Sequence, residues 1–498
     1  MAAFGNHPII LYNPPSSARK KPVVPMSLLA LGALLEGEHD YLIVDGNLEA
    51  DPAAALDRAI RETGADLLAV TVMPGPQLNH AAPLCRDLKQ RHPHLTVVWG
   101  GYFPTQHHDV CLRSGYVDYA VRGHGEVAFK ALVDALRQSG DPTSIPGLAY
   151  RDPASDEVVA NPMGAVPHPD RLPDYPYRRV DLARYARRTF MGNCTLPHHS
   201  SYGCPFKCAF CAVVNMTDGC WVAQSTGRTV AAVRRLVMEY SADSVEFYDN
   251  NFFVHEARTR EFAEWIKDLG IGWWGEARID TLLGYSEPTW TAMRESGLRM
   301  VFMGAESGSD ETLRLMNKGG TASTEKTLEI ARKMRSYNIV PELSFVLGNP
   351  PDPEADVRQT LEFIRRVKKA NPDSEIVLYM YTPVPIDNEM YGQVAAEGFR
   401  FPETLEEWIN PEWQQFSQRR SGHLPWVADS VHRQVRDFQR VLNARYPTAT
   451  DARLRGPWRW ALKAAGAWRY AARFYDYPLE LRVLQRLLRY QRPETSGF

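Results

Sequence analysis

The sequence predicts an α/β protein in which two strand-and-helix series precede a helical C-terminal region. Short, continuous apolar runs alternate with amphipathic segments from residue 1 to about residue 145. A second series, with roughly 30–45 residues per unit, starts near residue 190. Strand signals end near residue 405. Continuous apolar strands joined by helices indicate parallel sheets that are covered on both faces.

Composition excludes several classes of protein. The 498 residues suit about three domains of roughly 150 residues each. The 59 acidic and 57 basic residues nearly cancel, so no polyanion-binding field is expected and nucleic acid is not an expected partner. The longest apolar run, Met26–Leu35, is about half of the roughly 20 residues that a transmembrane helix needs. No secretory signal is expected, and seven cysteines are too few for a disulfide framework, so we expect a cytoplasmic protein.

Residues 1–145 are expected to form a Rossmann-like domain. Its strands are expected at Ile9–Tyr12, Tyr41–Val44, Leu67–Val72, Thr96–Trp99 and Tyr119–Val121. Its helices are expected at Met26–Leu35, Ala53–Arg61, Ala81–Gln90 and Val127–Arg137. Glycine and proline residues fall where these strands end, which is the edge at which parallel sheets bind ligands.

The remaining chain divides into three parts. Residues 146–190, rich in Pro, Asp and Arg, are expected to be a linker or arm. Residues 191–404 are expected to form a full or partial (β/α) barrel, with its chemistry at the carboxyl ends of the strands. The barrel strands are expected at Ser244–Tyr248, Gly272–Glu276, Met300–Gly304, Glu342–Val346 and Glu375–Tyr381. Helices are expected at Thr229–Tyr240 and Ala322–Ser336, and residues 405–498 are expected to form a helical domain.

Three closely spaced cysteines carry the chemistry. Cys204, Cys208 and Cys211 have the spacing C-x3-C-x2-C, and thiolates suit zinc and iron–sulfur clusters. A structural zinc site would need a fourth ligand, for which Cys220, His198 and His199 are the candidates. A cubane cluster held by three cysteines would keep one iron open. The spacing favours the cluster.

The cysteine motif, with the aromatic Phe210 before its last cysteine, resembles that of the radical S-adenosylmethionine (radical SAM) superfamily. The resemblance implies that the three cysteines hold a [4Fe–4S] cluster. Its open iron would chelate S-adenosylmethionine, which is cleaved to a 5′-deoxyadenosyl radical. Residues implied to contact S-adenosylmethionine are Phe210, Tyr248, Asp249, Asn250, Arg278, Glu306, Ser307 and Gly348.

The N-terminal domain resembles the cobalamin-binding domain fused to one radical SAM subgroup. Residues implied to contact cobalamin are Asn13, Pro14, Asp45, Thr71, Met73, Gly75, Gln77, Gly100, Gly101, Tyr102, Gly123 and Glu126. The histidine of the Asp-x-His-x-x-Gly motif is missing, because Gly46-Asn47-Leu48 follow Asp45. The resemblance therefore implies base-off cobalamin without a protein histidine ligand, and we expect none of His107, His108 and His124 to bind cobalt.

The resemblance implies a cobalamin-dependent methyltransferase. It would methylate an unactivated carbon of a small-molecule substrate, which can be large or apolar, through the 5′-deoxyadenosyl radical and methylcobalamin. An external donor of the flavodoxin or ferredoxin type would supply electrons. Two alternatives stay open: an oxidative cyclase or rearrangement enzyme without net methyl transfer, and a non-catalytic cobalamin- or metal-binding protein.

The last stretch, residues 451–498, is basic and aromatic. It holds ten Lys and Arg against four Asp and Glu, together with several Trp and Tyr residues. These helices are expected either to cover the barrel mouth as a lid or to contact a membrane surface, because Trp and Arg together suit a bilayer interface. Cys220 is expected either to pack or to lie on the substrate side of the cluster, and no oligomeric state is predicted.

Overall fold

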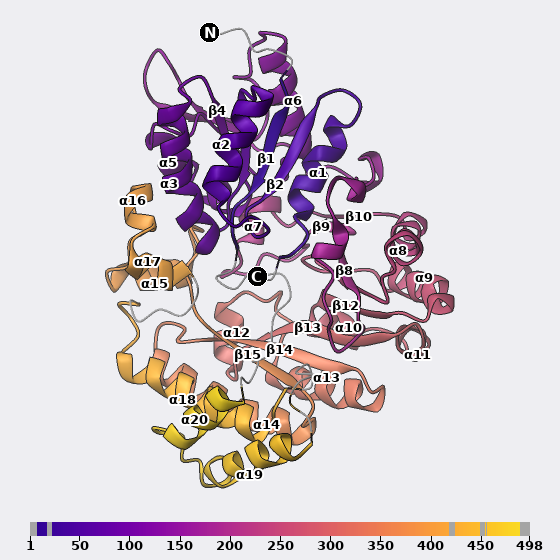
Figure 1. Cartoon of the computed structure of the whole chain (residues 1–498). Coiled ribbons are helices and arrows are strands. Elements are labelled where there is room, and N and C mark those ends of the chain that lie inside the picture. The colour runs from indigo at the N-terminus through magenta and orange to yellow at the C-terminus, as the bar shows by residue number, and fades with distance from the viewer. Residues whose placement is uncertain (1–6, 17–21, 418–423, 449–453, 455, 489–498) are drawn as a thin grey trace.

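The computed structural model describes residues 7–16, 22–417, 424–448, 454 and 456–488. Figure 1 shows an N-terminal sheet domain at the top, a second sheet with its helices below it, and the C-terminal helices at the lower end. No helix in these described ranges combines the length and the apolar character needed to cross a bilayer.

The N-terminal domain is built on a seven-stranded sheet with the order β2-β1-β3-β4-β5-β6-β7. Its strands are β1 (Ile9–Asn13), β2 (Tyr41–Asp45), β3 (Leu67–Thr71), β4 (Thr96–Gly100), β5 (Tyr119–Val121), β6 (Leu148–Arg151) and β7 (Val158–Ala160). Its helices are α1 (Met26–Leu35), α2 (Pro52–Thr63), α3 (Pro76–Arg91), α4 (Tyr102–Gln106), α5 (His108–Arg113) and α6 (Glu126–Arg137). The first five strands are parallel and confirm the expected positions.

The segment expected to be an arm, residues 146–190, begins differently. Strands β6 and β7 extend the N-terminal sheet in antiparallel fashion at its β5 edge. They are four and three residues long. β7 is apolar but only three residues long and partly buried, so its pattern is too short to indicate a strand. Past residue 161 the segment continues as an arm with three short 3₁₀ turns, at Pro169–Arg171, Tyr177–Arg179 and Leu182–Arg184.

The central sheet has six parallel strands in sequence order, which makes an open, partial barrel. Its strands are β8 (Thr195–His198), β11 (Ser244–Phe247), β12 (Gly272–Ala277), β13 (Leu298–Glu306), β14 (Val340–Leu347) and β15 (Glu375–Met380). Helices α8 (Thr226–Tyr240), α9 (Glu256–Ile266), α10 (Ile279–Leu283), α11 (Glu287–Glu295), α12 (Asp310–Leu315), α13 (Thr324–Ser336) and α14 (Pro353–Ala370) connect them. Five strands were expected; the sixth, β8, contains Pro197 and His198 and lacks a clear apolar pattern.

Alternation along the barrel strands separates two kinds of side chain. Val245, Trp273 and Val301 belong to the apolar core shared with the outer helices. The intervening positions point to the opposite, concave face, because successive strand residues face opposite sides. These positions are occupied by Glu246, Trp274, Glu276, Phe302 and Glu342.

The cysteine loop is framed by a small two-stranded sheet. Strands β9 (Ser201–Gly203) and β10 (Trp221–Ala223) pair antiparallel, and helix α7 (Val213–Thr217) lies between them in sequence. The loop therefore projects from the carboxyl end of β8, where barrel ligands bind.

The C-terminal helices form two groups. The first group is α15 (Glu389–Ala396), α16 (Leu405–Trp408) and α17 (Pro411–Ser417). Leu405 and Trp408 of α16 belong to the apolar core of the N-terminal domain. The second group is α18 (Asp429–Arg445), α19 (Pro457–Ala472) and α20 (Leu479–Leu487). These helices pack on one another and on α14, far from the N-terminal domain (Figure 1).

Candidate active site

The three cysteines lie in the loop between β9 and α7. All three are free and half-buried. Gly203 enters this loop with a φ of +75°, and a Cβ there would lie 2.2 Å from the carbonyl oxygen of Cys220. Glycine tolerates both the positive φ and the close backbone approach, so the chain can turn sharply just before Cys204.

The three cysteine sulfurs do not all lie within 4.8 Å of one another. Tetrahedral zinc with Zn–S bonds of about 2.3 Å requires sulfurs about 3.8 Å apart. Within the described ranges, the group of three donors that lie within 4.8 Å of one another is Glu38, His39 and Asp134, and the cysteine sulfurs form no such group. A wider set of three thiols with one open coordination position fits a cubane cluster.

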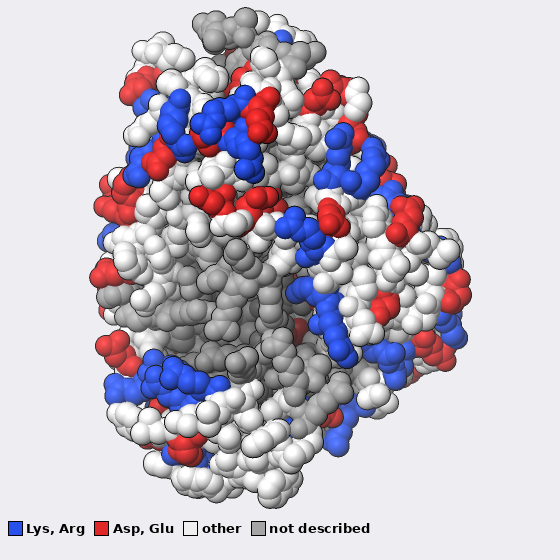
Figure 2. Space-filling view, viewed as in Figure 1, with Lys and Arg blue, Asp and Glu red and all other residues white. Residues whose placement is uncertain are grey.

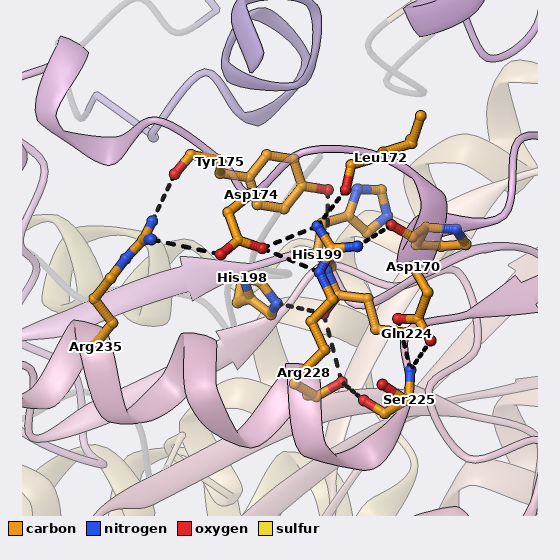
Figure 3. Close-up of polar contacts among 12 residues, drawn as sticks. Asp170, Leu172, Asp174, Tyr175, His198, His199, Gln224, Ser225, Arg228 and Arg235 are labelled. Atoms are coloured by element: carbon orange, nitrogen blue, oxygen red, sulfur yellow. Dashed lines mark hydrogen bonds and ion pairs between the residues drawn. The ribbon is translucent and has the colours of Figure 1, made fainter. Parts of the chain in front are cut away.

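Both ring nitrogens of His198, a candidate fourth zinc ligand, already have hydrogen-bond partners within the protein. Its Nε2 is 3.0 Å from Oε1 of Gln224, and its Nδ1 is 3.0 Å from the Tyr177 hydroxyl. Burial lowers the pKa of His198 to about 4, so the ring is neutral. Figure 3 shows this histidine enclosed by the arm and α8, where Asp174 pairs with Arg228 at 2.9 Å. His198 therefore braces the barrel against the arm.

Two cations adjoin the cysteine loop. The Arg278 Nη1 atom lies 3.7 Å from the Cys208 sulfur, and the guanidinium stacks 3.8 Å above the Phe206 ring. Burial raises the pKa of the Cys208 thiol, and the charges of Lys318 and Arg278 oppose that shift. Because iron-bound thiolates are anionic, this environment fits a thiolate-ligated cluster.

The two cations are themselves held by buried carboxylates. Arg278 donates to both oxygens of Asp280, at 3.0 and 2.8 Å, and to the Lys318 carbonyl at 2.7 Å. The Lys318 ammonium lies 2.9 Å from Oε1 of Glu306 and 2.6 Å from the Gly304 carbonyl. Sequence reasoning missed Lys318 and Asp280; the only local signal was the position of Asp280 two residues after Arg278.

The residues predicted to bind S-adenosylmethionine near β11 have different surroundings. Phe210 packs beside the core in the cysteine loop, and Asn250 is exposed. The Tyr248 hydroxyl donates to Glu246 at 3.1 Å. Asp249 accepts three hydrogen bonds, each of 2.6 Å, from the Ser200 amide and the hydroxyls of Ser200 and Ser201. Asp249 therefore holds the turn before the cysteine loop.

The predicted residues on β13 and after β14 are also fixed by the protein. Glu306 has a φ of +63°, an uncommon conformation for a residue with a side chain. Ser307 is fully buried and donates to Asp356 at 3.2 Å. The Gly348 amide donates to the same Asp356 at 2.9 Å, and its carbonyl accepts from Trp426 at 3.0 Å. Their contacts with S-adenosylmethionine stay predictions.

At the N-terminal domain, a buried polar network marks the carboxyl edge of the sheet. The Asn13 amide donates to Asp45 at 3.0 Å and accepts from Gln77 at 2.8 Å. Asp45 also accepts from Asn47 at 2.8 Å and from the hydroxyl of Tyr185, an arm residue, at 2.9 Å. Parallel sheets bind ligands at this edge.

The other residues predicted to bind cobalamin cluster around the same edge. Gly101 has a φ of +97°, and a Cβ there would lie 3.2 Å from the Thr71 hydroxyl, so bare backbone lines this turn. Met73 is 38% exposed although it adjoins the buried network. The remaining predicted residues lie before, in or after the turns at the ends of β1, β3, β4 and β5: Pro14, Gly75, Gly100, Tyr102, Gly123 and Glu126. An open edge with glycine turns and an exposed apolar side chain fits a bulky ligand such as a corrin.

Two of the histidines of the N-terminal domain pack against aromatic rings. Burial among Phe103, Phe401 and Trp408 lowers the pKa of His107 to about 4. His124 stacks on Tyr202 with ring centroids 4.4 Å apart. Both rings therefore serve packing between segments.

The cysteine loop touches the N-terminal domain. Gln106, the last residue of α4, accepts a hydrogen bond of 2.5 Å from Asn215 of α7. Its amide donates to the Ala212 carbonyl, directly after Cys211, at 3.4 Å. The Asn215 amide also donates to the Pro385 carbonyl at 3.2 Å. Two loops far apart in the sequence, after β4 and after β9, therefore meet.

Glu276, which sequence reasoning did not assign, lines the concave face near these loops. Its carboxyl has no hydrogen-bond partner within the part of the chain that the structure describes. Burial, with a smaller effect from Asp249, raises the pKa of Glu276 to about 8, so the group is protonated at neutral pH. It is a hydrogen-bond donor available to a ligand.

Comparison with known protein families finds one match in the N-terminal domain and one in the partial barrel. A B12 binding domain model matches residues 17–133, and a Radical SAM superfamily model matches residues 199–364. An uncharacterized methyltransferase of Pyrococcus horikoshii is 27% identical over 369 residues, which are 72% of this chain and 78% of the relative. The anaerobic magnesium-protoporphyrin IX monomethyl ester cyclase of Synechocystis is 27% identical over 391 residues, 75% of this chain and 74% of the relative.

The fold also matches a solved structure over nearly its whole length. The radical S-adenosylmethionine methyltransferase TsrM from Kitasatospora setae, solved with cobalamin and a [4Fe–4S] cluster, is similar with a TM-score of 0.65. The match covers 97% of this chain and 98% of that chain at 16% identity, so it concerns the fold. With its three-cysteine loop set against a B12 binding domain, the chain belongs to the radical S-adenosylmethionine enzymes that carry an N-terminal cobalamin-binding domain.

Proposed function

We propose that this enzyme is a methyltransferase that adds a methyl group to an unactivated carbon of a small-molecule substrate. The observation that carries the proposal is the contact between α4 and α7, because it sets the cluster loop beside the cobalamin edge. A radical formed near the cysteines and a methyl donor held at Gly101 would then share one space. The first relative is a methyltransferase, and the neighbouring structure TsrM is another.

The residues present fit the three groups that this reaction needs. Cys204, Cys208 and Cys211 would hold the cluster. The network around Asn13, Asp45 and Gln77, with the remaining turn residues, would hold cobalamin in its base-off form without a protein histidine. Once bound, these groups and S-adenosylmethionine supply electron transfer, a 5′-deoxyadenosyl radical and a transferable methyl group.

The chain's own residues position these groups and exclude water. Lys318 and Arg278 balance the negative charge of the thiolates, and Asp280 and Glu306 hold the two cations in place. Asp249 fixes the turn that leads into the cysteine loop. Glu276, protonated at neutral pH, donates a hydrogen bond to an acceptor on the substrate.

The cyclase-like alternative has one specific support. The Synechocystis cyclase is as similar in identity as the methyltransferase and covers slightly more of this chain. Cyclisation would leave the product without an added methyl group. For either reaction we propose a flavodoxin- or ferredoxin-type electron donor and a cytoplasmic, reducing location.

The test uses full-length protein reconstituted without oxygen with iron, sulfide and cobalamin. Iron, sulfide and cobalamin contents are measured first, and 5′-deoxyadenosine is then measured under strong reductant. Candidate substrates are incubated with S-adenosylmethionine that carries a deuterated methyl group. A methyltransferase gives a product with the deuterated methyl, and a cyclase gives none.

Cys208→Ala is the matched control, because it removes one cluster thiol and leaves the cobalamin edge intact. It should retain cobalamin and make no 5′-deoxyadenosine. Wild-type protein that binds zinc in place of iron, or that makes no 5′-deoxyadenosine, would contradict the proposal.

A further inference from the structure

The large apolar side chains exposed on the described surface concentrate on two helices. Thirteen such residues are exposed, and eight of them fall between residues 458 and 487. They are Trp458, Trp460, Trp468, Phe474, Tyr477, Leu479, Val483 and Leu487. This clustering over α19 and α20 is a contiguous feature of the chain, whereas single exposed apolar residues are ordinary.

Helix α19 turns one side fully outward. Trp460, Ala464 and Trp468 follow one another at four-residue spacing and are all exposed, so they form one stripe. The opposite side is held inward at Gly466, where a Cβ would lie only 2.7 Å from the Arg445 backbone nitrogen of α18. The outward stripe is therefore set by close helix packing.

Helix α20 repeats the arrangement. Leu479, Val483 and Leu487 have the same four-residue spacing, and they are 62%, 59% and 75% exposed. Leu481 is fully buried and anchors the inner side. Both helices therefore present an apolar row to the outside.

The turn between the two helices is held by contacts of Arg469 and Trp468. Arg469 is buried and pairs with Glu480 of α20, and it donates to the Asp476 carbonyl at 2.9 Å. The rings of Trp468 and Phe474 lie 6.0 Å apart between centroids. The helices are therefore held side by side at the lower end of the molecule (Figure 1). In Figure 2 this end is mostly uncharged at its lowest edge, with a group of Lys and Arg and a few acidic residues above it.

Cations border the apolar rows. Arg482 and Arg486 of α20 are exposed, and neither guanidinium group has a hydrogen bond or acidic partner among the residues described. They are separated by one helical turn, next to Val483 and Leu487, so guanidinium groups run alongside the apolar row. The exposed acid Asp476 is the only acidic residue of the described segment 456–488 besides Glu480, which Arg469 neutralises.

We propose that α19 and α20 form a docking face for an anionic membrane surface. Tryptophan favours the headgroup region, and unpaired arginines bind lipid phosphates. A protein partner would instead require acidic groups to meet these arginines at the rim of its interface. The inference stands on this surface alone and does not depend on the reaction catalysed.

The test is sedimentation of the full-length, cofactor-loaded protein with lipid vesicles. One set is phosphatidylcholine, and the other contains phosphatidylglycerol. Wild-type protein should bind the anionic vesicles more tightly, and added salt should weaken that binding. The double variant Arg482→Gln, Arg486→Gln should weaken this binding by roughly 30-fold. That factor corresponds to the loss of about 1 kcal/mol of binding free energy for each arginine.

Trp460→Ser with Trp468→Ser should abolish binding to both vesicle types. The matched control is Trp265→Ser on α9, which removes a 46% exposed tryptophan elsewhere and should leave binding unchanged. Unchanged iron and cobalamin contents would show that each variant is folded.

The proposal would be overturned if the wild-type protein bound no vesicles. It would also be overturned if Trp265→Ser reduced vesicle binding as much as the Trp460→Ser, Trp468→Ser variant does. Light scattering then tests whether a second copy of the chain covers this face instead. A concentration-dependent dimer that the Trp460→Ser, Trp468→Ser variant disrupts, without vesicle binding by the wild type, would assign the face to a second copy of the chain.

Discussion

At the scale of single residues, the candidate site depends on buried charges that are paired outside the cysteine loop. Lys318 and Glu306 are both nearly buried, with 8% of each side chain exposed. Removing one partner leaves the other charge buried and unpaired, which costs more than the pair contributes when both partners are present. These pairs therefore make the cluster environment sensitive to single substitutions.

Lys318→Met should destabilise the protein by about 3–5 kcal/mol, because Glu306 would stay buried without its cation. Cluster retention should fall as well, since the charge that favours the Cys208 thiolate is lost. Urea unfolding and iron content per chain measure the two effects. In the double variant Lys318→Met, Glu306→Gln, stability should largely return while iron content stays low. Recovery of both would show that Lys318 acts through folding alone.

Glu276 should impose a pH dependence on stability. Its pKa is raised in the folded state to about 8, so the folded protein holds this proton where the unfolded chain releases it. The contribution of Glu276 to stability is therefore greatest below its unfolded pKa near 4.5 and falls as the pH rises towards 8, by up to about 1.4 kcal/mol per pH unit. Glu276→Gln should flatten this slope in urea unfolding at pH 5, 6.5 and 8. A slope identical to that of the wild type would contradict the assignment.

At the scale of elements, most of the parallel strands could be predicted from the sequence, whereas the contacts between side chains at the strand ends could not. Five strands of each sheet coincide with apolar runs, and most of these strands are buried on both faces. β6, β7 and β8 were not predicted, since β6 and β7 are only four and three residues long and β8 contains Pro197 and His198. The position of Arg278 at the end of a strand could be predicted from the sequence. Its contact with the Lys318 carbonyl joins residues 40 positions apart, which no local pattern reveals.

Asp249 illustrates the same limit. Its position after β11 was readable from the sequence, and a contact with S-adenosylmethionine was the natural hypothesis. The structure gives its carboxylate three donors from Ser200 and Ser201, which come from the preceding barrel strand's turn. Which side chains fill a strand end depends on how neighbouring turns fold, and that information is tertiary.

The turn after β4 can be tested by adding one methyl group. Gly101→Ala should reduce cobalamin retention at least several-fold, because the Cβ would lie 3.2 Å from the Thr71 hydroxyl and 3.4 Å from the Val72 backbone. Gly115→Ala is the control: its φ of +78° imposes similar strain, but nothing lies within 4 Å of the new Cβ. Cobalamin absorbance per chain is the measurement. Equal loss in both variants would attribute the effect to backbone strain.

At the scale of the whole molecule, the active site is assembled by segments from three parts of the chain. The N-terminal sheet supplies one wall and the partial barrel another. The arm links them through Tyr185, which donates to Asp45, and through Tyr177, which bonds His198. Hydrogen bonds from the arm therefore reach both of the sheets that it connects.

Trp408→Ala tests this coupling. The indole packs against Phe103 and His107 of the N-terminal domain, with ring centroids 5.1 and 4.7 Å away. Its loss should destabilise the protein by about 3–5 kcal/mol and lower cobalamin retention, although the residue lies 307 positions after Gly101. Thermal unfolding and cobalamin content are the measurements, with Trp265→Ala as an exposed comparison. A loss of stability without any change in cobalamin would limit α16 to a structural role.

The placement of α16 has a consequence for biosynthesis. Leu405 and Trp408 complete the apolar core of the N-terminal domain. During translation the first domain therefore waits, incompletely packed, until the entire radical core has left the ribosome. Chaperone binding to the nascent chain should persist until that length is reached, and cobalamin should be captured only after synthesis is nearly finished.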